Sequence, residues 1–449
     1  MSNDYDLVVI GTGTASAGVS MRMRAAGWRV AVVDSRPFGG TCALRGCDPK
    51  KMLIGGAAAV DHVRRMAGKG VEGDARIDWA ELMAFKRTFT DPVPAKNEAR
   101  YAEKGIDAFK GAARFVGPGA VEVEGVGRLN ARRFVIASGA EPAKLGIPGE
   151  EHLLDNEGFL SLEKLPARVA MVGGGYVAAE FSHIAARAGA RVTILQHGDR
   201  LLANFEPELV AWSMESFRAL GVDVRLGASV DAIEKFDGGY RVMSSVAGAR
   251  VVVEVDAVIH AAGRVPALGG LDLAAAGVET ERGRLRLNEF LQSASNLAVY
   301  AAGDAAQAGP PLTPVSSHDA KVVSANLLEG NHARPDYRGV PSVVFTLPPI
   351  ASVGLSEADA RAKGLKFRMK SELASSWFTA RQAAEKVYGY KVLVDGATDL
   401  VLGAHLVGPH VDEVINIFAL AIRHGLTAEA LKTTMFAYPT GASDIGYML

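Results

Sequence analysis

Residues 6–16 read DLVVIGTGTAS, and this stretch decides the fold. Its apolar start predicts a buried strand, and the glycines that follow predict a tight turn into a helix. Gly11 allows the turn, Gly13 lets backbone approach a pyrophosphate, and the small side chain of Ser16 permits close helix–strand packing. Since the free N–H groups and the dipole of a helix N-terminus favour anions, the stretch predicts a phosphate-binding turn.

A second strand is expected at residues 29–33, and it ends at Asp34. Asp34 stands about 20 residues beyond the start of the motif, where a carboxylate can accept the hydroxyls of an adenosine ribose. Strand, turn, helix and strand together predict one complete βαβ unit for a dinucleotide.

The same unit recurs from residue 168 to residue 196. When the two copies are aligned, Gly11 matches Gly173 and Gly13 matches Gly175, and the alignment needs no gap. One glycine-rich turn is weak evidence, whereas two in register inside complete βαβ units are strong. We therefore expect an α/β protein with two Rossmann-like domains and two bound dinucleotides.

The chain has only two cysteines, Cys42 and Cys47. A disulfide framework would use more cysteines and a zinc site four ligands, so we expect a dithiol that opens and closes during turnover. Five residues of regular helix rise about 7.5 Å, beyond the roughly 7 Å limit between bridged Cα atoms. Cys42 is therefore expected on a distorted lead-in and Cys47 in the helix proper. Two inert, buried thiols are the alternative.

The composition excludes several partners. With 49 Lys and Arg against 50 Asp and Glu, the formal net charge is −1, which favours neither nucleic acid nor an anionic membrane surface. The sequence contains no apolar run of about 18 residues, so no membrane span is expected. Residues 1–6 lack a basic and apolar pattern, so no secretory leader is expected. The sparing use of cysteine suits a reducing cytoplasm, and the length suggests two to four domains. No metal site is predicted.

Residues 39–51, GGTCALRGCDPKK, carry the pattern GGTC-x4-C-x-P-x-K. This pattern resembles the redox signature of the pyridine nucleotide-disulfide oxidoreductases, the group of glutathione reductase, lipoamide dehydrogenase and mercuric reductase. The resemblance covers essentially the whole chain. It extends to a hinge motif, a crossover motif, a second FAD motif and the opening of a dimerisation domain, at residues 136–149, 262–266, 299–304 and 345–357.

The resemblance implies a domain plan and an activity. FAD would be bound by residues 1–150 and 264–335, and NAD(P)H by residues 151–263. Residues 336–449 would form an α+β dimerisation domain of a homodimer, in which the partner's C-terminal segment completes each active site. The implied enzyme is an FAD-dependent NAD(P)H:disulfide oxidoreductase of cell redox homeostasis. Cys47 would be the charge-transfer thiolate beside the flavin, and Cys42 would exchange with a small disulfide.

The resemblance also implies contacts for each cofactor. Those for FAD are Gly11, Gly13, Ser16, Asp34, Thr41, Lys51, Ala113, Ser138, Gly139, Arg264 and Asp304. Those for NAD(P)H are Gly173, Gly175, Tyr176, Ala178, Glu180, Gln196, His197 and Gly263. Lys51 would lie near flavin N5 and pair with Glu180, and Tyr176 would gate the nicotinamide. The structural alternatives are that Lys51 is an exposed helix lysine, Glu180 an ordinary helix carboxylate and Tyr176 a packed aromatic side chain.

The second repeat carries Gln196 where the first carries Asp34. Members that prefer NAD usually place an acid here, and members that prefer NADP place an arginine for the 2′-phosphate. With no carboxylate to repel a phosphate and with His197 and Arg200 nearby, we expect NADPH, and NADH remains the alternative.

The chain departs from the group's C-terminal signature, His-Pro-Thr-x-x-Glu. The histidine is replaced by Tyr438 and the acid by Ser443, although Asp444 is adjacent. Free histidine titrates near 6.5 and tyrosine near 10, so a tyrosine is the poorer base by about 3.5 units of pKa. Tyr438 can still donate a proton, or it is simply an interface aromatic.

Two charged residues lie close to the cysteines in sequence, Arg45 between them and Asp48 directly after Cys47. Arg45 could lower a thiol pKa, and Asp48 would act in the opposite direction. We therefore expect a site tuned to keep Cys42 as a thiolate without a histidine.

Substrate signals are few. Met21 stands where glutathione reductases carry an arginine, which argues against glutathione. A thiophilic metal ion such as Hg(II), a dihydrolipoamide dehydrogenase-like role and a flavin-linked redox sensor remain as alternatives. His183, His260 and His318 match no motif, and we expect His318 to be structural.

Overall fold

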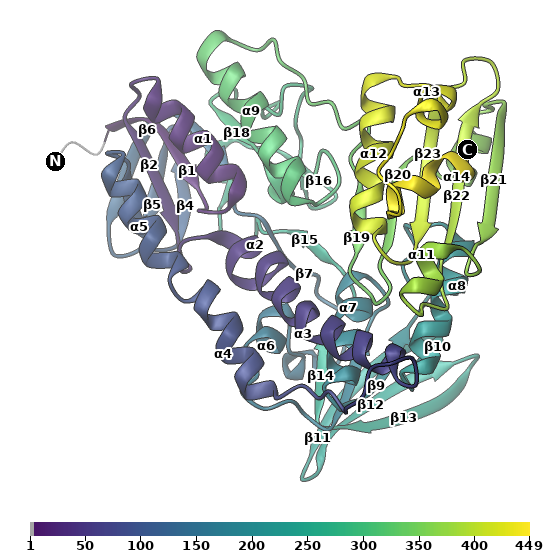
Figure 1. Cartoon of the computed structure of the whole chain (residues 1–449). Helices are drawn as coiled ribbons and strands as arrows, with labels where there is room; N and C mark the ends of the chain where they lie inside the picture. The colour runs from purple at the N-terminus through teal and green to yellow at the C-terminus, as the bar shows by residue number, and fades with distance from the viewer. Residues whose placement is uncertain (1–3) are drawn as a thin grey trace. The chain divides into compact units, whose positions relative to one another are not determined.

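The computed structural model describes residues 4–449 (Figure 1). The expectation about a leader rests partly on residues 1–3, which lie outside the described residues. The chain divides into two units, each assembled from three stretches. The first comprises residues up to Lys50, Phe85–Ala143 and Arg264–Tyr337. The second comprises Lys51–Ala84, Lys144–Gly263 and Arg338–Leu449. The division at residues 150, 263 and 335 stays a prediction.

The first unit is built on a sheet in the order β3-β2-β1-β6-β5-β4, with β18 also paired to β6. The strands β3, β2, β1, β6 and β18 run parallel, and β4, β5 and β6 run antiparallel. Their bounds are β1 Asp4–Ile10, β2 Val30–Asp34, β3 Asp107–Lys110, β4 Ala113–Gly117, β5 Ala120–Val123, β6 Gly127–Ile136 and β18 Val299–Ala301.

Helix α1 packs against α9 in the same unit, and Gly18 permits their close approach. A Cβ at Gly18 would lie 2.7 Å from Cβ of Ala320. The helices assigned wholly or partly to this unit are α1 Thr14–Ala25, α2 Gly40–Arg45, α3 Cys47–Met66, α4 Trp79–Thr90, α5 Val93–Glu103 and α9 Thr313–Glu329. Two short strands, β7 Ala140–Pro142 and β15 Arg264–Pro266, form an antiparallel pair.

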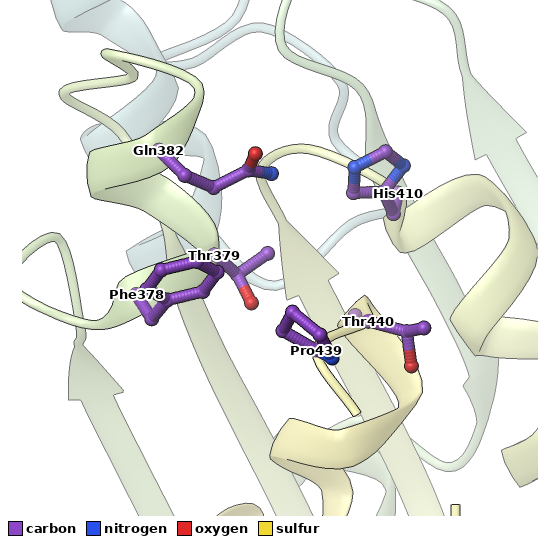
Figure 2. Close-up of a pocket in the computed structure, with 7 residues that line it drawn as sticks. Phe378, Thr379, Gln382, His410, Pro439 and Thr440 are labelled. Atoms are coloured by element: carbon purple, nitrogen blue, oxygen red, sulfur yellow. The ribbon is translucent and has the colours of Figure 1, made fainter. Parts of the chain in front are cut away.

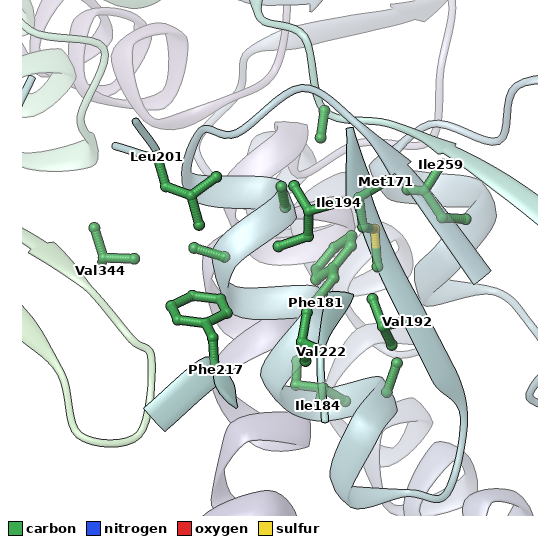
Figure 3. Close-up of a cluster of buried hydrophobic side chains, with 14 of the residues drawn as sticks. Met171, Phe181, Ile184, Val192, Ile194, Leu201, Phe217, Val222, Ile259 and Val344 are labelled. Carbon is green, nitrogen blue, oxygen red and sulfur yellow. The ribbon is translucent and has the colours of Figure 1, made fainter. Parts of the chain in front are cut away.

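The second unit contains a parallel sheet in the order β10-β9-β8-β14 and an antiparallel sheet β11-β12-β13. Figure 3 shows its core, where Phe181 and Ile184 of α7 lie among apolar side chains of β8 and β9. The bounds are β8 Arg168–Val172, α7 Tyr176–Arg187, β9 Arg191–Gln196, α8 Pro207–Ala219, β10 Asp223–Leu226, β11 Ala228–Phe236, β12 Gly239–Val246, β13 Ala249–Val255 and β14 Ala257–His260.

The repeat read from the sequence is present in the backbone. The orders β3-β2-β1-β6 and β10-β9-β8-β14 are the same, and Gly11 and Gly173 share a φ of 107°. A Cβ at Gly11 would lie 2.2 Å from the carbonyl oxygen of Ala137, and one at Gly173 would lie 2.4 Å from that of Ala261. Only glycine fits either turn. The predicted fold class, with two Rossmann-like sheets, is confirmed.

The C-terminal part of the second unit is an antiparallel sheet in the order β19-β20-β23-β22-β21, packed against α12. On β22 the buried ammonium of Lys391 lies 3.2 Å from a carboxylate oxygen of Glu206 and 2.9 Å from one of Glu357. A buried charge needs such partners. The bounds are β19 Ser342–Val344, β20 Ile350–Gly354, α10 Glu357–Ala362, β21 Phe367–Leu373, α11 Phe378–Gln382, β22 Gly389–Asp395, β23 Val401–Val407, α12 Val411–His424, α13 Ala428–Thr433 and α14 Ile445–Met448.

Between residues 4 and 449, no helix combines the length and apolar character needed to cross a membrane.

Candidate functional site

The dithiol lies where two helices meet. Cys42 belongs to the short α2, and Cys47 is the first residue of α3. Between the helices, Gly46 adopts φ −145° and ψ −109°, which breaks the helical path. Cys47 thus begins the long helix as predicted, whereas Cys42 lies in a separate helical turn rather than on an irregular lead-in. Both cysteines are free thiols, with Cys47 exposed and Cys42 half-buried.

A hydroxyl that the sequence analysis missed joins the two sulfurs. Thr313 Oγ1 donates to Cys42 Sγ at 3.1 Å and lies 3.5 Å from Cys47 Sγ. Thr313 is the first residue of α9, and no side chain caps this helix. The Thr313-Pro314 pair signals a helix start in the sequence. No local sequence pattern indicates that the first residue of this helix contacts two cysteines more than 260 residues earlier in the chain.

The environment shifts the pKa values of the two thiols in opposite directions. The pKa of Cys47 is lowered to about 6, mainly by the hydrogen bond with Cys42 and also by Thr313 and Lys50, while burial acts in the opposite direction. The same thiol–thiol hydrogen bond and burial raise the pKa of Cys42 above its usual range. These directions favour a thiolate on Cys47, the sulfur that the resemblance also assigned to the thiolate, and they do not support a thiolate held on Cys42. Lys50 is a cation that lowers the pKa of Cys47, whereas the sequence analysis assigned that effect to Arg45.

The first glycine turn is shaped for an anion. The N-cap of α1 is Gly13, which offers no side-chain cap, and the first turn carries no acid. Ser16 Oγ donates to the carbonyl of Gly11 at 2.5 Å, which locks the turn. Thr12 donates to Asp34 at 2.6 Å, and this carboxylate retains lone pairs for a ribose.

Apart from Lys51, which belongs to the second unit, the other predicted FAD residues lie in the first unit. A Cβ at Gly40 would lie 2.4 Å from Cα of Gly13, so the segment before Thr41 contacts the turn. The half-buried Asp304 has its pKa raised by burial, and Arg264 opposes that rise. A carboxylate in such a place is suited to hydroxyl donors like those of a ribityl chain.

The remaining predicted FAD residues have local structural partners. Ser138 Oγ donates to the carbonyl of Ala267 at 2.7 Å, and Gly139 has a φ of 77°. Arg264 donates to the carbonyl of Ala140, across the β7–β15 pair. Ala113 begins β4 and is buried. Of these residues, Ser138 lies beside the turn, since a Cβ at Gly11 would lie 3.3 Å from its backbone nitrogen. The turn and the carboxylate of Asp34 fit FAD.

The second glycine turn repeats the first. Gly175 is the N-cap of α7, again with no side-chain cap and no acid in the first turn. Tyr176 packs edge-on against Phe205 at 5.6 Å between ring centroids, and Ala178 is fully buried. Gly263 has a φ of 110° after β14. This end of α7 fits the pyrophosphate of a second dinucleotide.

The position that corresponds to Asp34 is buried rather than open. Gln196 is 8% exposed, and a Cβ at Gly174 would lie 2.9 Å from its side chain. His197 is exposed, and Arg200 donates to the carbonyl of Ala203 at 2.8 Å. The loop therefore exposes His197 and has no acid at the key position, while the exposed Asp199 lies 3.9 Å from Arg200.

Lys51 and Glu180 have Phe345 as a common neighbour. The backbone N–H of Phe345 donates to Glu180 Oε1 at 2.8 Å, and Lys51 Nζ lies 3.6 Å from the centroid of the Phe345 ring. Lys51 Nζ also lies 3.6 Å from Asp412 Oδ2. The structure thus gives Lys51 a carboxylate partner that the sequence analysis did not name. Asp412 and Phe345 are remote in sequence from both predicted residues, so no spacing could indicate them.

The C-terminal segment presents Tyr438 to solvent with 79% of its area exposed. Ser443 accepts from the backbone N–H of Thr440 at 3.3 Å and so serves as a cap. Asp444 is buried and accepts from the Tyr388 hydroxyl at 2.6 Å. Neither Ser443 nor Asp444 is free to act as the missing acid.

Figure 2 shows a small cavity beside this segment, with the imidazole of His410 and the ring of Pro439 on its walls. Its volume of about 40 Å³ is too small for a cofactor. The lining residues are Phe378, Thr379, Gln382, His410, Pro439, Thr440 and Gly441.

Two of the unassigned histidines serve as structural acceptors. His318 Nε2 accepts from the backbone N–H of Asp336 at 2.9 Å, which supports the structural interpretation. His183 Nδ1 accepts from the backbone N–H of Leu347 at 3.0 Å, and burial lowers its pKa well below the usual value. His260 is the last residue of β14.

Comparison with known proteins gives one family across nearly the whole chain. The family model described as pyridine nucleotide-disulphide oxidoreductase matches residues 5–320. The model of the dimerisation domain of the same family matches residues 340–448. Proteins of this family use FAD and a nicotinamide nucleotide.

Individual relatives agree with the family models. The chain is 32% identical to a mercuric reductase of Lysinibacillus sphaericus over 99% of its own length and 82% of that protein. It is 32% identical to a glutathione reductase of Burkholderia cepacia, covering 98% and 97% of the two chains. The Cu(II) complex of the HOCl-induced flavoprotein disulfide reductase RclA from Escherichia coli matches with a TM-score of 0.89 and 28% identity, covering 100% of this chain and 99% of that one. The chain therefore belongs to the pyridine nucleotide-disulphide oxidoreductases.

Proposed function

We propose that this flavoprotein oxidoreductase passes electrons from NADPH through FAD to Cys42 and Cys47, and from there to a small disulfide. The observation that carries the proposal is the thiol pair that Thr313 joins, in which the pKa of Cys47 is lowered and that of Cys42 is raised. Near pH 7 one sulfur is then a thiolate while the other keeps its proton. This is the state that a reduced dithiol needs before exchange.

FAD, when bound, supplies the two-electron chemistry that links a nicotinamide to the dithiol. The turn at Gly11 and Gly13 would hold its pyrophosphate, and Asp34 would accept the hydroxyls of the adenosine ribose. Asp304 would accept hydroxyls of the ribityl chain. By resemblance to the family, Lys51 would offset the negative charge of the reduced flavin.

The dithiol then exchanges with substrate in two steps. The proton of Cys42 first passes to the Cys47 thiolate along their hydrogen bond. The Cys42 thiolate then attacks one sulfur of the substrate disulfide, and the first half leaves as a thiolate that takes this proton from Cys47. The Cys47 sulfur attacks Cys42, which releases the second half and closes the Cys42–Cys47 disulfide. The two electrons of the dithiol leave with the products, and one product takes the proton that Cys42 gave up. Thr313 can donate to either sulfur, so it stabilises the charge as it moves.

The second product needs a proton, and we assign its donor to Tyr438 of the partner subunit. Tyr438 is exposed, and it lies in the part of the chain that matches the dimerisation domain, which supports a homodimer. A tyrosine can donate a proton, but it is a poor base at neutral pH. Oxidation of a dithiol such as dihydrolipoamide needs a base, so the proposed direction is disulfide reduction.

We propose NADPH as the donor, bound by the turn at Gly173 and Gly175. Gln196 presents no carboxylate to repel a 2′-phosphate, and the exposed His197 lies next to it. A cytoplasmic location is proposed with it, since a dithiol that must be reduced for each turnover suits a reducing compartment.

A second candidate substrate is a thiophilic metal ion. Two similar proteins support it by their descriptions, one a mercuric reductase and the other, RclA, solved as a Cu(II) complex. The exposed Cys47 and the half-buried Cys42 are accessible to such an ion. Soft metal ions favour thiolate sulfur.

An anaerobic titration of the holoenzyme tests the proposal. NADPH and then NADH are added while the visible spectrum is recorded. A long-wavelength absorption band after two electrons, absent in Cys47→Ser, is expected, and it should develop at lower NADPH than NADH. A flavin that bleaches directly in both proteins would disconnect the thiols and contradict the proposal. A panel of disulfides and Hg(II) or Cu(II) then distinguishes the two substrate classes.

A further inference from the structure

One face of α7 carries four polar or aromatic side chains. Tyr176, Glu180, His183 and Arg187 are spaced by four, three and four residues, which places them on the same side of a helix. Three of them, Glu180, His183 and Arg187, hydrogen-bond backbone groups of residues 345–347. Burial raises the pKa of the fourth, Tyr176, and the side chain of Ser342 opposes that rise.

The backbone of this segment is held at the N–H groups of two alternate residues, Phe345 and Leu347. Glu180 accepts from the N–H of Phe345 at 2.8 Å, and His183 accepts from the N–H of Leu347 at 3.0 Å. Arg187 donates to the carbonyl of Leu347 at 3.3 Å. The three side chains are at most 4% exposed. Hydrogen bonds in such a buried setting hold a segment firmly, because breaking one leaves a buried group unpaired.

A further ion pair anchors Arg187. Arg187 Nη2 lies 2.6 Å from Oδ1 of Asp61 on α3, and Oδ2 of Asp61 lies 2.7 Å from Arg65 Nε. The C-terminal end of α7 is thereby joined to α3, the helix that carries Lys51. The segment and Lys51 are positioned by one shared framework.

The side chain that this framework presents to Lys51 is the ring of Phe345. Lys51 Nζ lies 3.6 Å from the ring centroid, inside the range of a cation–π contact, and 3.6 Å from Asp412. The Lys51 side chain is 50% exposed, so without such contacts it would sample many rotamers.

We propose that Phe345 is a positioning residue that holds the Lys51 ammonium in place for the reaction, and that His183 acts through it. The proposal rests on the function assigned to Lys51 above. An ammonium fixed beforehand stabilises developing negative charge without a cost of reorganisation. A mobile ammonium would do so less well.

The experiment compares the holoenzyme variants Phe345→Leu, Phe345→Tyr and Lys51→Met, measuring the midpoint potential of the bound flavin and the steady-state constants for NADPH. We expect Lys51→Met to make the potential more negative. Phe345→Leu should shift it in the same direction by a smaller amount and lower kcat about fivefold, with KM for NADPH within about twofold. Phe345→Tyr, which keeps the ring, should restore the wild-type values.

A second pair of variants guards against a folding defect at Phe345. His183→Asn keeps an acceptor for the Leu347 N–H and should leave the potential unchanged. His183→Leu removes the acceptor and should shift the potential as Phe345→Leu does.

Two outcomes would overturn the proposal, and they are distinguishable. If Lys51→Met shifts the potential and the folded Phe345→Leu and His183→Leu do not, Phe345 does not position Lys51, while the proposed function stands. If Lys51→Met itself leaves the potential unchanged, the role assigned to Lys51 also fails.

Discussion

Thr313 is the residue on which the two thiols converge. Its hydroxyl donates to Cys42 and lies within hydrogen-bonding distance of Cys47, so it stabilises a thiolate on either sulfur. With the family's histidine replaced by Tyr438, this hydroxyl is a hydrogen-bond donor that the chain supplies close to its own cysteines.

Replacing Thr313 by valine should make the thiolate less stable. A hydrogen bond to a charged group contributes about 1.5–3 kcal/mol, and 1.36 kcal/mol corresponds to one pKa unit. We expect the pKa of Cys47 to rise from about 6 by about one unit. The rate of alkylation by iodoacetamide, followed against pH in the reduced protein, should shift upward accordingly and fall at pH 6–7.

Thr313→Ser keeps the hydroxyl and is the matched control, with an alkylation profile close to that of the wild type. An unchanged profile in the valine variant would remove Thr313 from the exchange mechanism.

At the residue scale, the sequence predicts what local patterns encode. The glycine turns and the break near Gly46 follow from spacing and from backbone freedom. Thr313, Asp412 and Phe345 could not be predicted, because each joins the site through contacts between segments far apart in sequence. The hypothesis that Cys42 is kept as a thiolate relied on charged neighbours in the sequence. The largest effect on both thiols is instead the hydrogen bond between them, which favours the charge on Cys47.

At the scale of elements, the two βαβ units are similar enough to be tested against each other. Their strand orders match, and the first glycine of each turn has the same φ. Period and turn chemistry sufficed to predict these elements to within about two residues at most boundaries. The conformation of residues 342–347 in the second unit was harder to predict from the sequence, because side chains of the distant helix α7 hold its backbone.

Gly11→Ala and Gly173→Ala should each remove one nucleotide selectively. The added Cβ would lie 2.2 Å from one carbonyl oxygen and 2.4 Å from the other, and a φ of 107° strains any other residue by about 1–3 kcal/mol. We expect Gly11→Ala to purify without flavin absorbance. Gly173→Ala should remain yellow, with KM for NADPH raised at least about tenfold.

Gly189→Ala separates strain from steric clash. It has a similar φ of 102°, but a Cβ there meets nothing within 4 Å. It should lower thermal stability slightly and leave both nucleotides bound. If Gly173→Ala behaved in the same way, the second turn would not hold the nicotinamide nucleotide.

At the scale of the whole molecule, the question is whether one subunit supplies Tyr438 to the dithiol of another. The match to the dimerisation domain over residues 340–448 establishes the domain, and the exposed Tyr438 lies within it. A homodimer has two equivalent sites, so subunits with different defects can complement each other.

Mixing Cys42→Ser subunits with Tyr438→Phe subunits tests this arrangement. Random reassociation after mild denaturation gives heterodimers as half of the dimers, and each heterodimer has one complete site if Tyr438 acts across the interface. The mixture should therefore recover about one quarter of the wild-type disulfide reductase activity. Each parent alone should show little activity. Recovery of none would mean that Tyr438 acts within its own subunit. A fully active Tyr438→Phe parent would mean that Tyr438 does not take part in the reaction.

Because the two βαβ units align without a gap, a residue of the first unit can be introduced at the equivalent position of the second. Position 196 corresponds to position 34, at the end of the equivalent strand, and the glycine turns before them have matching geometry. Transplanting the carboxylate, as Gln196→Asp, needs less volume than the glutamine packed over Gly174. We expect the ratio of kcat/KM for NADPH over NADH to fall by at least about tenfold, since a carboxylate repels a 2′-phosphate and accepts ribose hydroxyls. An unchanged ratio would show that the copies, alike in backbone, have diverged in how they select a ligand.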